Sequence, residues 1–295
     1  MIRMLLFVFA NMAIMAMILI ITRIFGVDAY LTKQGMNYYA LLAFAMIVGF
    51  AGSFISLLIS KIIAKMIYSI KVITEPENEE ERFLYNTVQK LAGAASIPMP
   101  EVGIYDSPEA NAFATGPTKR SSIVAVSSGL LRNMDKRQIE GVLAHEISHV
   151  ANGDMVTMAL LQGVLNTFVV FLSRVIGYIA DMALRKDDDR DEGPGFIYFI
   201  VSILCEIVLS IIASMIVMAY SRHREFKADA SAAMLSGKDK MIEALEQLKV
   251  IVENRVQPDN VPALNSFKIS GPSRMIKLFS THPPLQDRID ALRNM

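Results

Sequence analysis

Four long apolar stretches limit what this chain of 295 residues can fold into. They cover roughly residues 4 to 25, 38 to 60, 156 to 180 and 196 to 220. Each matches the ~20 residues that an α-helix needs to cross the hydrocarbon core of a bilayer. The composition agrees, because 53% of the residues are hydrophobic and only 20% are charged. We therefore expect a mainly α-helical membrane protein with four hydrophobic helices.

The four stretches differ in how purely apolar they are. The first two are nearly free of charge before Arg23 and Lys61, and they predict membrane spans. The third contains Arg174 and the fourth contains Glu206, and charges of this kind are costly inside a bilayer. They predict either a mutual pair or contact with water in an incomplete span, with a substrate or ion pathway as the alternative. Whether these two segments cross completely stays open.

The apolar stretches and the polar segments between them divide the chain into four parts. These are an N-terminal membrane hairpin (1–70), a soluble part (71–155), a second hydrophobic hairpin (156–220) and a C-terminal part (221–295). Basic residues follow the second and fourth stretches: Lys61, Lys65, Lys71, Arg222, Arg224 and Lys227. By the positive-inside rule, both soluble parts face the cytoplasm and the short connectors at 26–37 and 181–195 face the other side.

Charge and cysteine content exclude several kinds of protein. The formal net charge is zero, so no basic excess points to a nucleic-acid partner. The single cysteine, Cys205, excludes an intramolecular disulfide and a cysteine-based zinc cluster. The lipid bilayer is the one partner that the composition predicts.

A short stretch, AHEISHVANGDMV, holds two of the four histidines of the chain, His145 and His149. The residues before it predict a helix, because Asp135 and Gln138 form a capping-box pattern and apolar residues recur at helical spacing. Gly153 is typical of a helix end. Histidines four residues apart project from one face of a helix, so both can bind one metal ion. The alternative is a pair of core or surface histidines without a metal.

A catalytic zinc ion needs a third protein ligand and one open position. A histidine six residues after His149 is absent, because Met155 stands there. The stretch SRHREFKADA, after the fourth apolar segment, offers Glu225 as a ligand and Asp229 as a residue that orients a ligand imidazole. The second hairpin returns Glu225 to the membrane face where His145 lies. Taken alone, the acidic pair would be a solvated helix face.

The residue Glu146 lies between the two histidines and is offset around the helix, where it can reach a metal-bound water without ligating the ion. A tetrahedral oxyanion also needs a donor besides the metal. The first candidate for this donor is Arg222, one turn before Glu225, and the second is His282. The alternative for His282 is a loop residue that docks the final helix.

The remaining polar segments predict a small sheet and packing helices. EVGIYDS, NAFATG and SSIVAVSS have the β-branched content and the flanking turn residues of short strands. Asn111, at the start of NAFATG, is equally compatible with a turn. Helices are predicted for PENEEERFLYNTVQKLAGAA, DKMIEALEQLKVIVEN and PPLQDRIDALRNM.

Taken together, HEISH and the later EFKAD resemble the HtpX-type membrane zinc metalloproteases, relatives of the CAAX prenyl endopeptidases. The same family is matched by three further stretches, NAFATG, SSIVAVSSGLL and THPPLQDRI, so the resemblance covers nearly the whole chain. It implies an α+β gluzincin-type zinc peptidase domain with one Zn²⁺ per chain. It implies that His145, His149 and Glu225 are the zinc ligands and that Glu146 is the general base. Asp229 would orient a ligand imidazole without binding the ion. Asn111, Ala112 and Phe113 would form the edge strand that binds the substrate backbone.

The resemblance also implies a function and a location. The expected enzyme is an endopeptidase that hydrolyses misfolded, unfolded or misassembled membrane proteins in quality control and stress response. It is expected in the bacterial inner membrane, with several spans and its active site in the cytoplasm. One alternative is an intramembrane site-2-type zinc protease, which the charged DKRQIE turn argues against. Another is a non-catalytic membrane scaffold with a vestigial metal site, which the intact Glu146 argues against.

Overall fold

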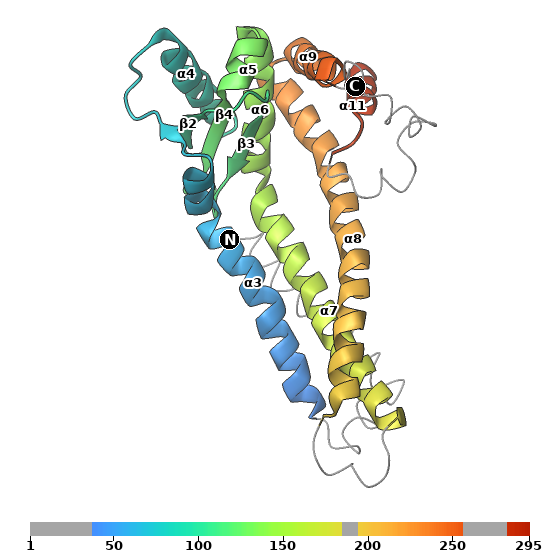
Figure 1. Ribbon diagram of the computed structural model, residues 1–295. Coiled ribbons are helices and arrows are strands. Elements are labelled where there is room, and N and C mark those ends of the chain that lie inside the picture. The colour runs from blue at the N-terminus through green and yellow to red at the C-terminus, as the bar shows by residue number, and fades with distance from the viewer. Residues whose placement is uncertain (1–36, 185–193, 256–281) are drawn as a thin grey trace. The chain divides into compact units, whose positions relative to one another are not determined.

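The computed structural model describes residues 37–184, 194–255 and 282–295 (Figure 1). The first apolar stretch, residues 4 to 25, lies outside the described residues, as do most of the two connectors. The chain forms two compact units. One contains Met1–Ile55 and Ala159–Ser214, and the other contains Ser56–Met158 and Met215–Met295.

Among the described residues, three helices are long and apolar enough to cross a membrane. They are α3 (Tyr38–Ile67), α7 (Asp154–Leu184) and α8 (Phe196–Ser236). They contain 30, 31 and 41 residues, more than the ~20 that a span requires. The sequence prediction is therefore confirmed for the second, third and fourth apolar stretches in length and composition.

In the first unit, α3 and α7 are in close contact through small residues. A Cβ atom added at Gly49 would lie 2.5 Å from the backbone nitrogen of Thr167, so a side chain there would separate the two helices. Such close approach at small residues is how membrane helices gain van der Waals contact without a hydrophobic driving force. Nearby, the rings of Tyr38 and Phe171 meet edge to face at 5.6 Å between their centroids.

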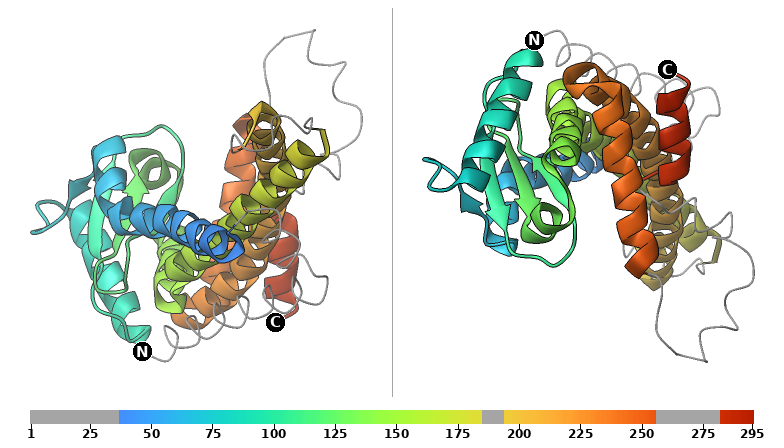
Figure 2. Two further views of the ribbon diagram at one scale, coloured as in Figure 1. Left: turned by 90° about the horizontal axis from the view of Figure 1, so that it is seen from below. Right: turned by 90° about the horizontal axis from the view of Figure 1, so that it is seen from above.

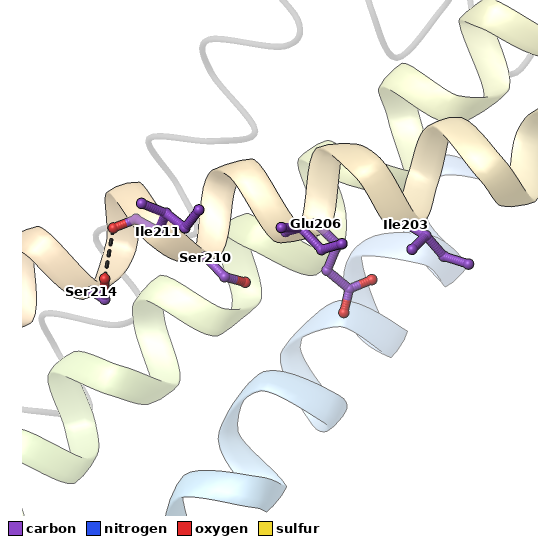
Figure 3. Close-up of a pocket in the computed structure, with 6 residues that line it drawn as sticks. Ile203, Glu206, Ser210, Ile211 and Ser214 are labelled. Carbon is purple, nitrogen blue, oxygen red and sulfur yellow. Dashed lines mark hydrogen bonds between the residues drawn. The ribbon is translucent and has the colours of Figure 1, made fainter.

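The charges in the third and fourth apolar stretches pair with each other. Arg174 Nη1 of α7 lies 3.3 Å from Glu206 Oε2 of α8. The predicted mutual pair is thus confirmed. Figure 3 shows the surface of α8 around Glu206, where a shallow pocket is lined by Ile203, Glu206, Ile207, Ser210, Ile211 and Ser214. The Ser214 hydroxyl donates to the Ile211 carbonyl, 2.7 Å away, which satisfies it within the helix.

The second unit contains a four-stranded mixed sheet with the strand order β1-β2-β4-β3. The strands are β1 (Lys71–Val72), β2 (Glu101–Tyr105), β3 (Ala112–Thr115) and β4 (Ile123–Ser127). β2 and β4 are parallel, and the two outer pairs are antiparallel. The three predicted strands are confirmed, while β1 was not predicted because two residues give no periodic pattern. β3 is an edge strand, and Phe113 lies opposite Ala125 in its register with β4.

Helices surround one hydrophobic core in this unit. They are α4 (Glu79–Ala94), α5 (Ser128–Asn133), α6 (Lys136–Asn152), α9 (Lys238–Arg255) and α11 (Leu285–Arg293). Leu84, Val126, Leu143, Leu245 and Ile289 bring side chains from α4, β4, α6, α9 and α11 into this core. α6 contacts α4, α9 and β3, and α9 lies beside α11 (Figure 2). The core therefore fixes α6, the helix of the HEISH stretch, between the sheet and the C-terminal helices.

Both ends of α6 agree with the sequence prediction. The Asp135 carboxylate accepts from the backbone N–H groups of Arg137 and Gln138, and the Gln138 side chain accepts from the Asp135 N–H, which completes the capping box. At the other end Gly153 adopts a φ of 67°, a left-handed conformation that glycine reaches without strain. α7 begins at the next residue, Asp154.

Replacing the N-cap of α6 tests how much this helix end contributes to stability. We expect Asp135→Ala to lower the free energy of unfolding by about 1 kcal/mol, a fall in Tm of a few degrees, because two helix N–H groups lose their acceptor. Asp135→Asn should stay close to wild type, because an asparagine side chain also accepts these bonds. Thermal unfolding in detergent measures both, and an unchanged Tm for the alanine variant would contradict the assignment.

Candidate metal centre

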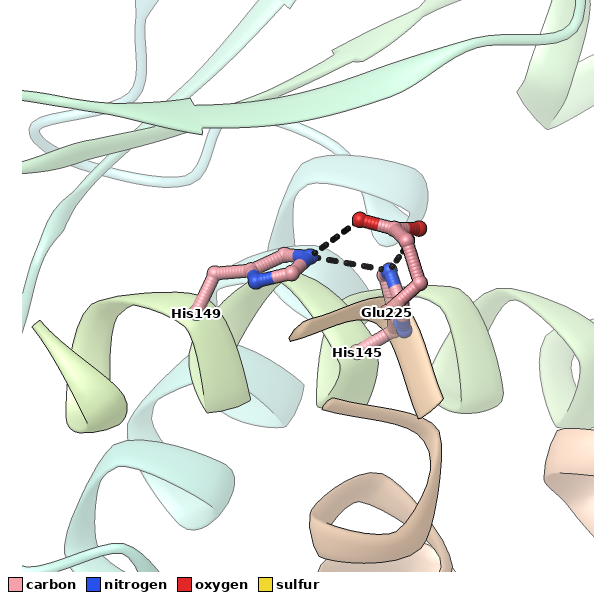
Figure 4. A group of neighbouring side chains, drawn as sticks. All are labelled: His145, His149 and Glu225. Atoms are coloured by element: carbon pink, nitrogen blue, oxygen red, sulfur yellow. Dashed lines mark hydrogen bonds and ion pairs between the residues drawn. The ribbon is translucent and has the colours of Figure 1, made fainter. Parts of the chain in front are cut away.

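Three side chains from two helices converge on one point in the second unit (Figure 4). His145 and His149 project from α6, and Glu225 projects from α8. The two Nε2 atoms lie 3.1 Å apart. Glu225 Oε2 is 3.5 Å from His145 Nε2, and Glu225 Oε1 is 3.3 Å from His149 Nε2. All three residues are buried.

These donor atoms fit a metal ion. A tetrahedral ion with bonds of about 2.0–2.2 Å holds its ligand atoms roughly 3.3–3.6 Å apart. One donor atom from each of the three side chains lies within 4.8 Å of the other two, so small side-chain adjustments bring all three onto one ion. Glu225 is fully buried, and its Oε1 has no hydrogen-bond partner among the described residues. A bound cation would satisfy this oxygen, which is otherwise costly to bury. Two imidazoles and one carboxylate leave a fourth position open, as catalytic sites require.

The surrounding carboxylates make the site attractive to positive charge. Burial disfavours a charge on the His149 imidazole, but the hydrogen bond to Asp154 and the nearby Glu225 carboxylate outweigh burial and raise the pKa of His149 to about 9. Burial also disfavours a charge on His145, and there Asp229 and Glu225 raise the pKa. A metal ion bound to both Nε2 atoms would supply this positive charge and displace the protons.

A carboxylate and an arginine hold the far side of the His145 ring. Asp229 Oδ1 lies 2.9 Å from His145 Nδ1. Arg288 of α11 binds Asp229 with two hydrogen bonds, from Nε at 2.7 Å and from Nη2 at 2.6 Å. Asp229 and Arg288 are both buried. Because Nδ1 faces a carboxylate, the ring is oriented with Nε2 toward Glu225.

The ring of His149 is held by a different carboxylate. Asp154 Oδ2 lies 2.6 Å from His149 Nδ1, and Asp154 is buried at the first residue of α7. Sequence reasoning missed Asp154, because a residue five positions after His149 is not at helical spacing. The signal was the glycine between them, which turns the chain. Sequence reasoning also missed Arg288, which lies 59 residues after Asp229 in the THPPLQDRI stretch.

The other residues proposed for the reaction, Glu146, His282 and Arg222, differ in their burial and in their contacts with the candidate ligands. Glu146 follows His145 on α6 and is half-buried. His282 Nδ1 lies 2.8 Å from Glu225 Oε2, while 61% of the His282 side chain stays exposed. Arg222 is half-buried one turn before Glu225 on α8. The structure therefore brings His282 into contact with a candidate ligand.

The stretch proposed for substrate binding forms the sheet edge next to α6 (Figure 1). Ala112 and Phe113 belong to β3, and Asn111 precedes it. The Asn111 N–H donates to Ser127 Oγ at 3.0 Å, and its carbonyl accepts from the Ser127 N–H at 2.9 Å. Asn111 therefore continues the pairing with β4 by one residue rather than forming a free turn.

Removing Arg288 tests the buried carboxylate behind His145. We expect Arg288→Met to lower the free energy of unfolding by about 3–5 kcal/mol, because the buried Asp229 carboxylate loses both guanidinium hydrogen bonds. Arg293→Met is the matched control on α11, since Arg293 pairs with Glu246 at the surface and an exposed pair contributes only about 0–1 kcal/mol. Thermal unfolding in the presence of a chelator measures both, and equal effects would show that Asp229 needs no counter-ion.

Known proteins match this chain over almost all of its length. The sequence model of peptidase family M48 matches residues 78–295. A protease HtpX homolog from Methylacidiphilum infernorum is 52% identical over 296 residues, which cover 99% of this chain and 98% of that protein. Protease HtpX from Pseudoalteromonas atlantica is 50% identical over 295 residues, with 99% of both chains covered.

A solved structure shows the same fold. The crystal structure of Ste24p from S. mikatae matches with a TM-score of 0.60 and 19% sequence identity. The match covers 96% of this chain and 66% of that chain. The family match, the high identity to HtpX proteases and the three apolar helices agree with one another. The chain therefore belongs to peptidase family M48, as a membrane metalloprotease of the HtpX type.

Proposed function

We propose that this metalloprotease is a zinc-dependent endopeptidase of the HEXXH type, with a gluzincin-type site that holds one Zn²⁺ per chain. The convergence of His145, His149 and Glu225 within 4.8 Å of one another is the observation that carries the proposal. Zinc suits this set, because it accepts imidazole and carboxylate ligands and keeps a fourth position for water or substrate. When bound there, the ion would polarise the scissile carbonyl and lower the pKa of a coordinated water.

In the proposed reaction Glu146 moves the proton. Glu146 is next to His145 on α6, and its charge acts on His149 and Arg288, which supports a place beside the ligand set. As general base, the carboxylate takes a proton from the attacking water and then delivers it to the leaving amine nitrogen. A half-buried carboxylate can perform both steps, because it is neither sealed in the core nor fully hydrated.

His282 is the better supported of the two proposed oxyanion donors. Its Nδ1 is within hydrogen-bond distance of Glu225, which fixes the ring beside the candidate ligand set. The His282 side chain is 61% exposed, so a peptide substrate can reach the ring, and a ring N–H would donate to the developing oxyanion. Arg222 is one turn from Glu225 on the same helix and is retained as the second candidate.

Substrates are proposed to bind as an extra strand along β3. The edge position of β3 and its contact with α6 support this, because a peptide paired there would run past the two histidines. Within the stretch Asn111, Ala112 and Phe113, the main-chain groups that do not pair with β4 would provide affinity with little sequence selectivity. The proposed substrates are unfolded or misassembled membrane proteins, degraded in quality control and stress response.

The proposed location is the bacterial inner membrane. The three described apolar helices and the stretch at residues 4 to 25 would provide four spans. The lysine and arginine distribution supports an active site in the cytoplasm. The four-part division at residues 70, 155 and 220 stays a prediction.

Two variants separate catalysis from metal binding. Glu146→Gln should abolish peptide hydrolysis, by about 10²-fold or more, and keep about one zinc per chain, because only proton transfer is lost. Glu225→Ala should lose most of the zinc and the activity together, because the ion retains only two protein ligands. Zinc content by atomic emission and cleavage of an unfolded protein measure both. Undiminished hydrolysis by the Glu146→Gln variant would contradict the mechanism, and absence of hydrolysis by the wild-type protein would favour a non-catalytic role for the site.

Cysteine labelling tests the orientation. In a Cys205→Ser background, Asp188→Cys places a thiol in the connector between the third and fourth apolar stretches, and Glu79→Cys places one at the exposed start of α4. An impermeant maleimide added outside spheroplasts should label residue 188 directly and residue 79 only after permeabilisation. The reverse pattern would invert the topology, and labelling of both only after permeabilisation would show that the last hairpin does not cross.

A further inference from the structure

The two candidate zinc-binding histidines are each backed by a carboxylate, and each carboxylate has an arginine nearby. For His145, the backing residues are Asp229 and Arg288, joined by hydrogen bonds of 2.6 and 2.7 Å. For His149, they are Asp154 and Arg224, where Arg224 Nη1 lies 4.0 Å from Asp154 Oδ2. Arg288 and Asp229 are thus joined by direct hydrogen bonds, whereas Arg224 and Asp154 are separated by the longer distance of an ion pair.

The position of Asp154 depends on the turn at Gly153. On a straight helix, a residue five positions after His149 would lie about 140° around the helix and point away from it. The left-handed φ of 67° at Gly153 ends α6 and starts α7 in a new direction. This turn brings the Asp154 carboxylate to 2.6 Å from His149 Nδ1. Asp154 also lies in the first turn of α7, where a negative charge is favourable to the helix dipole.

The environment of Arg224 supports a role beside Asp154. Arg224 immediately precedes Glu225 on α8, and 22% of its side chain is exposed. Its Nε is buried and has no hydrogen-bond partner among the described residues. A buried N–H donor without an acceptor is costly, so the group is poised to bind an acceptor close by. Of the described carboxylates, Asp154 is the one within ion-pair distance of this guanidinium.

We propose that Asp154 and Arg224 are positioning residues for His149. Asp154 fixes the imidazole so that Nε2 faces the ion, and Arg224 compensates the charge of the buried Asp154. The pair connects the first turn of α7 with the residue next to Glu225, so that both ligands are fixed by one set of contacts. This inference rests on the proposed zinc site and adds two residues to it.

The test is zinc affinity, measured by competition with a chromogenic chelator on the full-length protein in detergent. Asp154→Asn keeps the size of the side chain but removes its charge, and we expect zinc to bind about 10- to 100-fold more weakly, the usual effect of losing a carboxylate behind a ligand histidine. Arg224→Gln should weaken binding severalfold alone and add little in the Asp154→Asn background, because it acts through Asp154.

A matched control comes from the same helix. Asp181 is a buried aspartate of α7 that accepts hydrogen bonds from the backbone N–H groups of Gly195 and Tyr198, and Asp181→Asn should leave zinc affinity unchanged. The absorption spectrum of Co²⁺-loaded protein gives a second readout, which should change in Asp154→Asn and stay as in wild type in Asp181→Asn.

The outcomes distinguish the inference from the proposed function. Wild-type affinity in Asp154→Asn would overturn the role of Asp154, and equal losses for Arg224→Gln in both backgrounds would overturn its action through Asp154. If the Asp154→Asn protein does not fold, Arg224→Gln decides alone, since wild-type affinity there contradicts the proposal. Failure of the wild-type protein to bind zinc would instead refute the proposed zinc site.

Discussion

The buried carboxylate of Glu225 is the group on which the rest of the site depends. Its side chain is fully buried, and burying an unpaired charge costs far more than any single packing contact returns. Glu225 is therefore surrounded by groups that bear or accept positive charge: His145, His149, His282 and Arg288. These come from α6, α11 and the residues before α11, so neutralising one carboxylate requires distant parts of the chain to meet.

The carboxylates behind the two histidines must be neutralised as well. Asp229 and Asp154 orient the two α6 imidazoles, but each adds another buried negative charge. Arg288 neutralises Asp229 with two hydrogen bonds, and its pKa is raised, because these and nearby carboxylates outweigh the burial that disfavours its charge. The C-terminal helix α11 is thus part of the candidate metal centre, since without it Asp229 would be a buried charge with only an imidazole beside it.

Sequence reasoning was strongest where the site follows helical spacing. The capping box at Asp135, the end at Gly153 and the four-residue spacing of His145 and His149 are local features, and the structure contains each of them. The contact between Asp229 and Arg288 was not predictable, because no periodicity relates residues 59 positions apart. Asp154 was missed for a different reason: its approach to His149 depends on a left-handed glycine, and spacing rules for a continuous helix do not apply across it.

The aromatic residues behind β3 limit how the proposed substrate strand is selected. The Phe113 ring lies 5.2 Å from the ring of Tyr68 and 5.6 Å from that of Tyr105, so it is engaged within the protein. Ala112 and Ala114 pack against the hydrophobic core and are small. A peptide on the free edge of β3 would therefore meet mostly backbone, and main-chain pairing discriminates by conformation rather than by sequence. Folded proteins already pair their strands internally, so we expect selection of substrates by their lack of folded structure.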